Sequence, residues 1–216
     1  MTASPVDAKT LRSDARRNRE RLVASARELF AEAGVDVPVE EITHRAGLGM
    51  GTLYRHFPTK EELIDAVLED AFGVLVELAE QAAAEEDAWA GLVGFLEQAL
   101  ALHAANRGLK DVVAERGHVG RRVQAMRARM QPLLRRVIER AQEQGSLRAD
   151  FTAEDLPLVL WTGGRVIETT GGVAPGLWRR YLGLLLDGLR AEGATPLTAP
   201  PLTRAQLDRI ARTRTR

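Results

Sequence analysis

The chain of 216 residues contains no cysteine, so disulfide bonds, thiol redox sensing and cysteine-ligated zinc are all excluded. Aromatic residues are also scarce, at 5%, although apolar residues reach 45%, as in globular proteins. The most apolar run, residues 182–186, stops at Asp187 and is too short to span a bilayer. Residues 1–11 lack the apolar core of a signal peptide. We therefore expect a soluble, cytoplasmic protein with no membrane partner.

The chain also lacks net charge, but its charges are segregated along the sequence. Residues 9–21 are mainly basic, residues 61–87 carry acidic residues and no basic one, and residues 107–148 are rich in arginine. Because the local field decides what a surface attracts, the basic N-terminal stretch is a candidate for phosphate contact, through Arg16 and Arg17 above all. The alternative is a solvated, disordered arm.

Apolar residues recur at helical spacing, and no segment alternates like a β-strand, which predicts an all-α fold of about nine helices. Pro132 lies inside one predicted helix and predicts a kink or a break there. Residues 202–213 form either a short tail helix or a disordered basic tail. The predicted helices span residues 16–33, 38–47, 50–56, 59–84, 87–103, 109–116, 119–144, 153–169 and 175–192. Residues 59–62 are expected to form a capping box, and Asp87 is expected to cap the helix that it begins.

Residues 42–63 are the most informative stretch for function. Two short helices are expected on either side of Gly47, which stands where a left-handed residue must end the first. The second helix would expose Thr52, Tyr54, Arg55 and His56. This pattern is typical of a helix-turn-helix, whose second helix enters the major groove of DNA. An ordinary helical hairpin is the alternative that spacing alone leaves open.

The run Gly-Thr-Leu-Tyr-Arg-His-Phe at 51–57, followed by Lys-Glu-Glu-Leu at 60–63, resembles the signature of the TetR/AcrR family of bacterial transcriptional regulators. Leu-Phe-Ala-Glu-Ala-Gly at 29–34 is similar to the same family. The resemblance implies a three-helix DNA-binding domain and a larger helical domain for ligand binding and dimerisation. We expect a flexible arm at 1–14, a DNA-binding domain at 15–64, a regulatory domain at 65–193, and a proline-rich linker with a basic tail at 194–216.

The resemblance also implies that Thr52, Tyr54, His56 and Lys60 contact DNA, mostly at phosphates. Tyr54 could instead be a core residue. Base readout is expected from the front of the second helix, with Arg55 on a guanine or a phosphate. The predicted DNA-binding residues are Arg16, Arg17, Met50, Gly51, Thr52, Tyr54, Arg55, His56 and Lys60. The sequence departs from the family pattern where Thr43 replaces a usual alanine and where Gly49 and Met50 replace a serine cap and a basic or polar residue. Val39 likewise stands where the family often has a threonine that contacts the DNA backbone.

The predicted helix at 175–192 is apolar around most of its circumference, which implies burial on nearly all sides and hence a partner chain. The resemblance implies that it pairs with the helix at 153–169 and with the same two helices of a second copy. A twofold dimer would read a palindrome with half-sites about 34–36 Å apart. The predicted interface residues are Gly163, Gly164, Trp178, Tyr181, Leu182, Leu185 and Leu189.

The regulatory domain is expected to bind a small effector, apolar or amphipathic. Its candidate lining residues are Trp89, Phe95, His103, Met126, Met130, Trp161 and Arg165, each of which could equally be a core residue. Arg165 and Glu168 are expected to form an ion pair rather than a ligand clamp. The four histidines are scattered, so no metal site is predicted, and no cofactor is expected.

These features predict a repressor that binds palindromic double-stranded DNA as a homodimer and is released by its effector. An activator, or a repressor without a ligand, is the alternative within the same class. A helical enzyme is the alternative from another class, but no nucleophile–base pair is visible, so we predict no catalytic residues and no enzyme.

Overall fold

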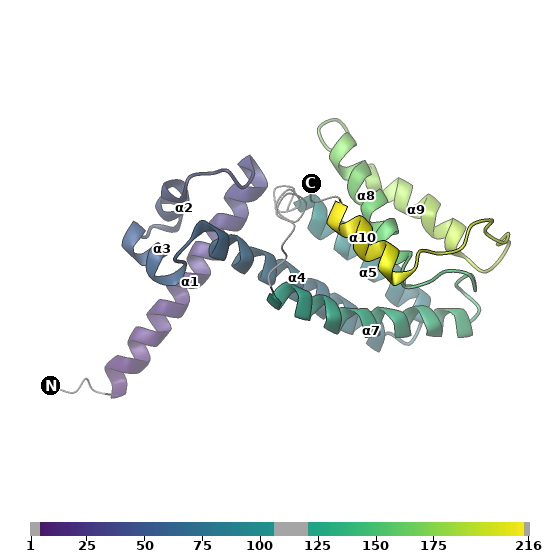
Figure 1. Ribbon diagram of the computed structural model, residues 1–216, viewed down its shortest axis with the longest axis horizontal. Helices are drawn as coiled ribbons and strands as arrows, with labels where there is room; N and C mark the ends of the chain where they lie inside the picture. The colour runs from purple at the N-terminus through teal and green to yellow at the C-terminus, as the bar shows by residue number, and fades with distance from the viewer. Residues whose placement is uncertain (1–4, 106–120, 214–216) are drawn as a thin grey trace. The chain divides into compact units, whose positions relative to one another are not determined.

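The computed structural model describes residues 5–105 and 121–213, which are helical except for turns, extended segments and one isolated bridge between Leu147 and Arg190 (Figure 1). The all-α prediction is confirmed. The predicted helix at 109–116 lies outside the described residues. The helices of the described ranges are α1 (Pro5–Ala33), α2 (Val39–Ala46), α3 (Met50–His56), α4 (Lys60–Ala84), α5 (Ala88–Ala105), α7 (Arg121–Glu143), α8 (Leu156–Thr170), α9 (Trp178–Leu189) and α10 (Arg204–Thr213).

Two compact units divide the chain within α4. The first unit contains α1, α2, α3 and the beginning of α4 as far as Asp70, and the second contains the rest of α4 from Ala71 together with α5 and α7 to α10. Helix α4 therefore contributes residues to both units. None of the described helices is both long enough and apolar enough to cross a membrane.

The first unit is built around one face of α1. Leu22, Ala26, Leu29 and Phe30 recur at helical spacing and are buried, and α1 packs against both α2 and α3. From α3, Leu53 is fully buried in the same unit. The predicted ends of α2 and α3 hold to within a residue, and α1 ends at Ala33 as predicted but begins earlier.

Helix α1 begins at Pro5, so residues 5–14 of the expected flexible arm belong to a helix. Proline suits the first turn of a helix, and no glycine or further proline interrupts the chain until Gly34. Among the side chains of α1 whose burial is described, the fully buried ones begin at Leu22. The N-terminal part of α1 extends away from α2 and α3 (Figure 1).

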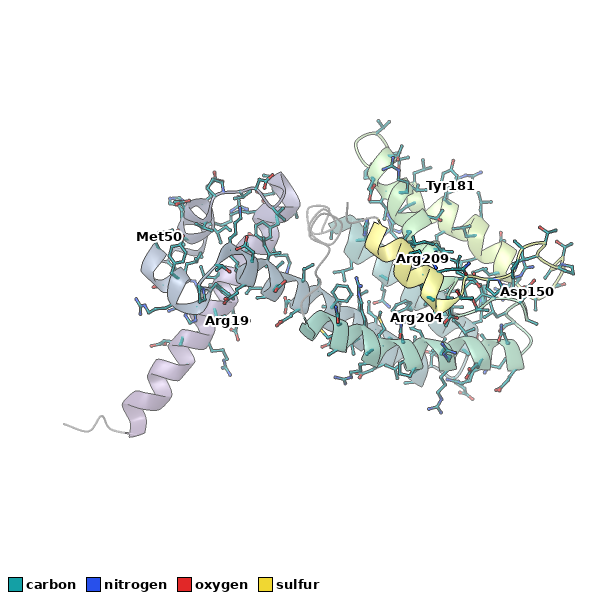
Figure 2. The ribbon with its side chains drawn as sticks, in the orientation of Figure 1. Arg19, Met50, Asp150, Tyr181, Arg204 and Arg209 are labelled. Atoms are coloured by element: carbon teal, nitrogen blue, oxygen red, sulfur yellow. The ribbon has the colours of Figure 1, made fainter. Side chains whose placement is uncertain are left out.

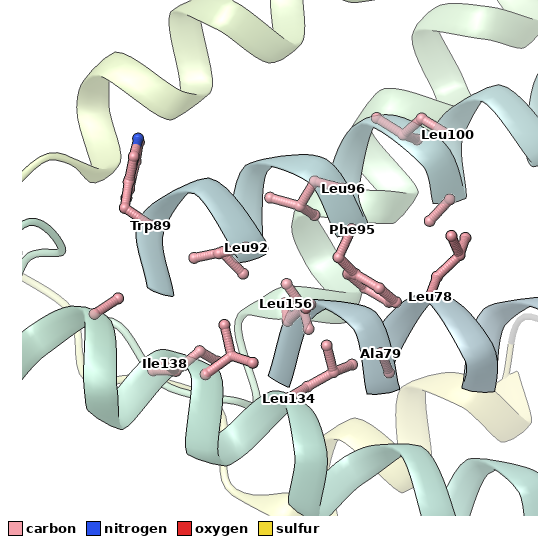
Figure 3. Close-up of a cluster of buried hydrophobic side chains, with 14 of the residues drawn as sticks. Leu78, Ala79, Trp89, Leu92, Phe95, Leu96, Leu100, Leu134, Ile138 and Leu156 are labelled. Carbon is pink, nitrogen blue, oxygen red and sulfur yellow. The ribbon is translucent and has the colours of Figure 1, made fainter. Parts of the chain in front are cut away.

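The core of the second unit surrounds α5, whose Leu92, Phe95, Leu96 and Leu100 are buried (Figure 3). Side chains from α4, α7, α8 and α9 complete this core. Asp87 caps α5 as predicted, since its Oδ1 accepts hydrogen bonds from the backbone N–H groups of residues 89 and 90 at 2.9 and 3.1 Å.

Helix α7 passes through Pro132 without a break, so that part of the prediction is wrong. Proline inside a helix costs about 3 kcal/mol because it removes one hydrogen bond and crowds the preceding turn. Pro132 is exposed, whereas Leu134, Val137 and Ile138 on the following turn are buried in the core. Burial of these three side chains offsets the local cost, at roughly 1.5–3 kcal/mol each.

The segment after α9 is fixed to the second unit by hydrogen bonds and is not a free linker. The guanidinium of Arg148 donates to the carbonyl oxygens of Gly188 and Thr195, at 3.0 and 2.6 Å, and to Asp150. Asp150 in turn accepts the backbone N–H of Leu197 at 3.2 Å. We name Arg148 and Asp150 the clasp.

The tail helix α10 follows the clasp, which decides between the two expectations for residues 202–213. Thr203 and Gln206 form a reciprocal capping box, in which each side chain accepts the other's backbone N–H at 3.3 and 2.8 Å. Leu207 is buried, so α10 packs against the protein through an apolar side chain.

Candidate nucleic-acid interface

A left-handed glycine forms the turn between α2 and α3. Gly47 has φ 61° and ψ 39°, and its N–H donates to the carbonyl of His44 while that of Leu48 donates to Thr43. The guanidinium of Arg21 on α1 donates to the carbonyl of Ala46 and supports the same turn. The predicted left-handed conformation of Gly47 is confirmed, and α3 follows after only three residues.

Helix α3 buries one face and exposes the other. Leu53 and, just after the helix, Phe57 are buried. Tyr54 is 49% exposed, which excludes the alternative that it is a core residue. Arg55 is exposed as well, and its Nε donates to the carbonyl of Gly51 at 3.0 Å. The outward face of α3 therefore presents a phenol and a guanidinium next to an exposed glycine.

The remaining predicted residues of α3 flank this face. Thr52 and His56 are half-buried, and the ring of His56 lies 6.4 Å from that of Phe57. Met50 is also half-buried, and its sulfur lies 3.5 Å from the hydroxyl of Thr43. The same hydroxyl donates to the carbonyl of Glu40 at 2.9 Å, so the unusual threonine satisfies its polar atom within α2.

Lys60 opens α4 beside the exposed face of the first unit. The hydroxyl of Thr59 accepts the backbone N–H of Glu62 at 3.2 Å, as the predicted capping box requires. Lys60 itself is half-buried as the first residue of the helix. The free N–H groups of a helix N-terminus and a lysine at the same point favour a phosphate oxygen.

The arginines of α1 differ in what they contact. Arg16 and Arg17 are exposed, and each pairs with a nearby acid of its own helix, Glu20 at 3.6 Å and Asp14. Arg19 instead lies over the ring of Phe57, 5.2 Å from its centroid. Exposed ion pairs contribute only about 0–1 kcal/mol. Arg16 and Arg17 are therefore available to exchange a carboxylate for a phosphate.

Sequence reasoning missed two ion pairs that fix the helices of this unit. Arg45 on α2 forms two hydrogen bonds, at 2.8 and 2.9 Å, with the carboxylate of Glu32 on α1. This contact lowers the pKa of Glu32 and raises that of Arg45. Arg27 on α1 pairs with Asp70 on α4. No local pattern signals either pair, because each joins residues on different helices.

The seven residues predicted for the effector site lie on α5, α7 and α8 of the second unit, and they differ in burial. Trp89 and Phe95 are buried in the core, and the guanidinium of Arg190 lies 4.2 Å from the ring centroid of Trp89. His103 stands fourteen residues further along α5 than Trp89, which is about 21 Å of helix. Of the other predicted residues, Met130 packs against the core, Met126 and Trp161 are half-buried, and Arg165 is exposed.

The predicted ion pair of Arg165 with Glu168 is present, at 3.2 Å. Glu168 also lies 3.9 Å from Nε2 of His103.

Four of the seven residues predicted for the dimer interface are buried inside the chain itself. A side chain at Gly163 would lie 2.6 Å from Leu100, so this glycine permits close packing of α8 on α5. Gly164 faces His103 in the same way. Trp178 and Leu182 belong to the core. Helical periodicity identified the apolar residues but could not tell which face of α9 meets the same chain.

The other predicted interface residues lie on or beside an exposed face of α9. Tyr181 is 45% exposed, while Leu185 and Leu189 are half-buried. Leu184, which was not predicted, is 57% exposed and lies one turn beyond Tyr181. Figure 2 shows Tyr181 on the outside of α9. We name Tyr181 and Leu184 the apolar face of α9.

A glycine-turned helix pair with an exposed polar second helix, joined to a separate helical unit, defines a helix-turn-helix DNA-binding regulator. The family model for bacterial regulatory proteins of the tetR family matches residues 22–67. The model for the C-terminal domain of SbtR-like transcriptional regulators matches residues 87–191.

Solved structures agree with these matches. The TetR transcription regulatory protein of Mycobacterium vanbaalenii is 33% identical, with 83% of this chain and 99% of that chain covered and a TM-score of 0.63. FadR of Bacillus subtilis, solved in complex with stearoyl-CoA, shares the fold at 17% identity and a TM-score of 0.61, with 79% of this chain and 98% of that chain covered.

Curated relatives match only the DNA-binding part. HTH-type transcriptional regulators of Staphylococcus aureus are 39% identical over 67 residues, which is 31% of this chain and 36% of theirs. The chain thus matches about a third of the length of these relatives. The chain belongs to the TetR family. It is a transcriptional regulator with a DNA-binding helix-turn-helix domain, and not an enzyme.

Proposed function

We propose that the protein is a repressor that binds a palindromic operator as a homodimer and leaves it when a small effector binds the second unit. The observation that carries the proposal is the exposed face of α3, where Tyr54 and Arg55 project from a helix whose opposite face is buried through Leu53. Both side chains are large and polar, and neither packs in the core, so both are available to contact DNA.

The proposed DNA contacts divide into two kinds. Tyr54, Thr52, His56 and Lys60 hold phosphates, and Arg16 and Arg17 add contacts from α1. Arg55, beside Gly51 and Met50, reads base edges, with its guanidinium donating to a guanine. Exposed Gly51 allows the front of α3 to approach the bases closely, since it carries no side chain.

The apolar face of α9 supports the homodimer. Tyr181 and Leu184 lie three residues apart on one side of α9, and α8 packs along its other side. An exposed apolar face on a helix is stabilised when a second copy covers it, and a twofold axis makes the same face serve both chains. Two copies then present two α3 helices to one DNA duplex, which implies a palindromic site.

Release by an effector follows from the place of α4. This one helix begins with Lys60 in the first unit and continues into the second, so a ligand that moves its second half changes the position of its first. FadR, which shares the fold, binds stearoyl-CoA. By linkage, the effector and the operator must weaken each other's binding by the same factor.

Selection of bound sites from random double-stranded DNA tests the proposal with the full-length protein. We expect an inverted repeat whose half-sites are about 34–36 Å apart. Arg55→Ala should relax the preference at one base pair of each half-site, whereas Arg129→Ala, an equal loss of charge on α7, should leave the selected sequence unchanged. Recovery of no shared sequence would refute operator binding, and a single unrepeated site would refute the dimer.

Regulation is tested separately with a reporter gene behind the selected site. Deletion of the regulator should raise expression if the protein is a repressor. A fall in expression would show an activator, which is the alternative within this family.

A further inference from the structure

We propose that Arg127 on α7 binds the anionic group of the effector, so that the effector is an amphipathic organic anion such as a carboxylate. The inference rests on the proposed effector response and adds its chemical class. Arg127 is half-buried, and its guanidinium carbon lies 5.0 Å from the centroid of the Phe72 ring on α4. Both residues belong to the second unit.

Arg127 is half-buried and has no acidic partner and no carbonyl acceptor among the residues that the structure describes, whereas the other half-buried arginine described on α7, Arg140, donates to the carbonyls of residues 83, 85 and 86. Two residues beyond Arg127, exposed Arg129 pairs with Glu80, and Arg135 pairs with Glu154 at 3.3 Å. Burial alone lowers the pKa of Arg127, and no carboxylate opposes that effect. Arg127 is therefore the half-buried arginine described on α7 whose guanidinium meets neither a carboxylate nor a carbonyl of the described residues.

The Phe72 ring does not satisfy the guanidinium. A ring face attracts a cation by about 0.5–2 kcal/mol, but it is no acceptor for the five N–H donors of arginine. Removing a charge from water is costly unless a counter-charge and hydrogen-bond acceptors replace the solvent. A carboxylate does both through two parallel N–H···O bonds, a geometry to which arginine is suited and lysine is not.

The neighbouring side chains indicate the rest of the ligand. Met126 precedes Arg127 on α7, and Met130 follows it by nearly one turn and packs against the core. Methionine is flexible and adapts to irregular apolar shapes. A ligand anchored at Arg127 therefore meets Phe72 and the two methionines with its apolar part, which favours an organic anion over a free inorganic one.

Thermal unfolding of the full-length protein tests the site with matched probes of equal shape. Sodium octanoate is compared with octanamide, and sodium benzoate with benzamide. We expect at least one carboxylate to raise the Tm of the wild type and of Arg129→Met, and neither amide to do so. In Arg127→Met the apparent Kd for that carboxylate should be about tenfold to hundredfold weaker, as loss of hydrogen bonds to a charged group requires.

The variants also report on the unliganded protein. Arg127→Met removes an unpaired charge, so its Tm without ligand should equal or exceed that of the wild type. Arg127→Lys keeps the charge but loses the paired donors, so it should bind the carboxylate more weakly than the wild type. A clearly lower Tm for Arg127→Met would overturn the proposal, since it would show an arginine paired within the chain. Equal shifts with acid and amide, or no shift with either acid, would overturn it too.

Operator release distinguishes this inference from the proposed function. If a carboxylate stabilises the protein through Arg127 but leaves operator affinity unchanged, the anion site stands and regulation by that ligand fails. If the amides release the operator as well as the acids do, effector release stands and the anionic class fails.

Discussion

Gly47→Ala is expected to destabilise the first unit more than the matched substitutions Gly34→Ala and Gly51→Ala. Gly47 has φ +61°, a conformation that costs a residue with a side chain about 1–2 kcal/mol. The added Cβ would also lie 2.9 Å from Nη2 of Arg21, whose hydrogen bond to Ala46 supports the turn. Loss of that bond adds about 1 kcal/mol. The total is about 2–3 kcal/mol.

Two other glycines serve as matched controls for the two parts of this effect. Gly34 has φ +82° and open space around its Cβ position, so Gly34→Ala isolates the backbone cost of about 1–2 kcal/mol. Gly51 lies inside α3 with open space and no positive φ. Gly51→Ala should therefore stabilise the helix by about 0.5–1 kcal/mol.

Hydrogen exchange of the backbone amides over residues 39–56 is the direct measurement. A loss of 2–3 kcal/mol should speed exchange of the most protected amides by about 30- to 150-fold. Trp89, Trp161 and Trp178 all lie in the second unit, so tryptophan fluorescence should show an unchanged unfolding transition there. Gly47→Ala with the same exchange rates as Gly51→Ala would refute the reasoning from φ and from Arg21.

Three further predictions concern the other contacts. Lys60→Ala should weaken operator binding evenly across DNA sequences and reduce the slope of log K against log salt concentration by about one. Filter binding at several salt concentrations measures both effects. Loss of preference at a single base pair would contradict a phosphate contact. Leu184→Glu should place a charge on the apolar face of α9 and give monomers in sedimentation, whereas an intact dimer would exclude this face. Arg148 and the N–H of Leu197 lower the pKa of Asp150 to about 2, from a value near 3.9 in the unfolded chain. The clasp therefore stabilises the fold above about pH 4 and loses this contribution as the pH falls toward 2, so Asp150→Asn should flatten the acid limb of the Tm profile, and an unchanged limb would contradict the clasp.

Local chemistry allowed several elements to be placed from the sequence. Gly47 ends α2, α3 spans 50–56 as predicted, and Asp87 caps α5. Each depends on a glycine, a cap or a spacing within one turn. The capping box of Thr203 and Gln206 is a local sequence signal of the same kind. It favours the tail helix α10 over a disordered tail for residues 202–213.

The candidate effector and dimer residues were harder to place, because a pattern along one helix does not say which neighbour each face meets. Gly163 was expected between two chains but lies against Leu100 of its own chain. Trp89 and His103 are both aromatic and yet lie at opposite ends of α5. The sequence does not distinguish Arg127 from the other arginines around it. Only the packing of α7 on α4 places Arg127 over the Phe72 ring and leaves Arg129 exposed.

By itself the sequence determined what depends on neighbours within a few residues: helical periodicity, the left-handed turn, the helix caps and the polar outer face of α3. Only the tertiary structure decided which arginines are exposed, which pair with acids on other helices, and which face of α9 is left uncovered. The physical reason is that a helix fixes the direction of each side chain relative to its axis, whereas burial and charge pairing depend on where other helices pack, often many residues away.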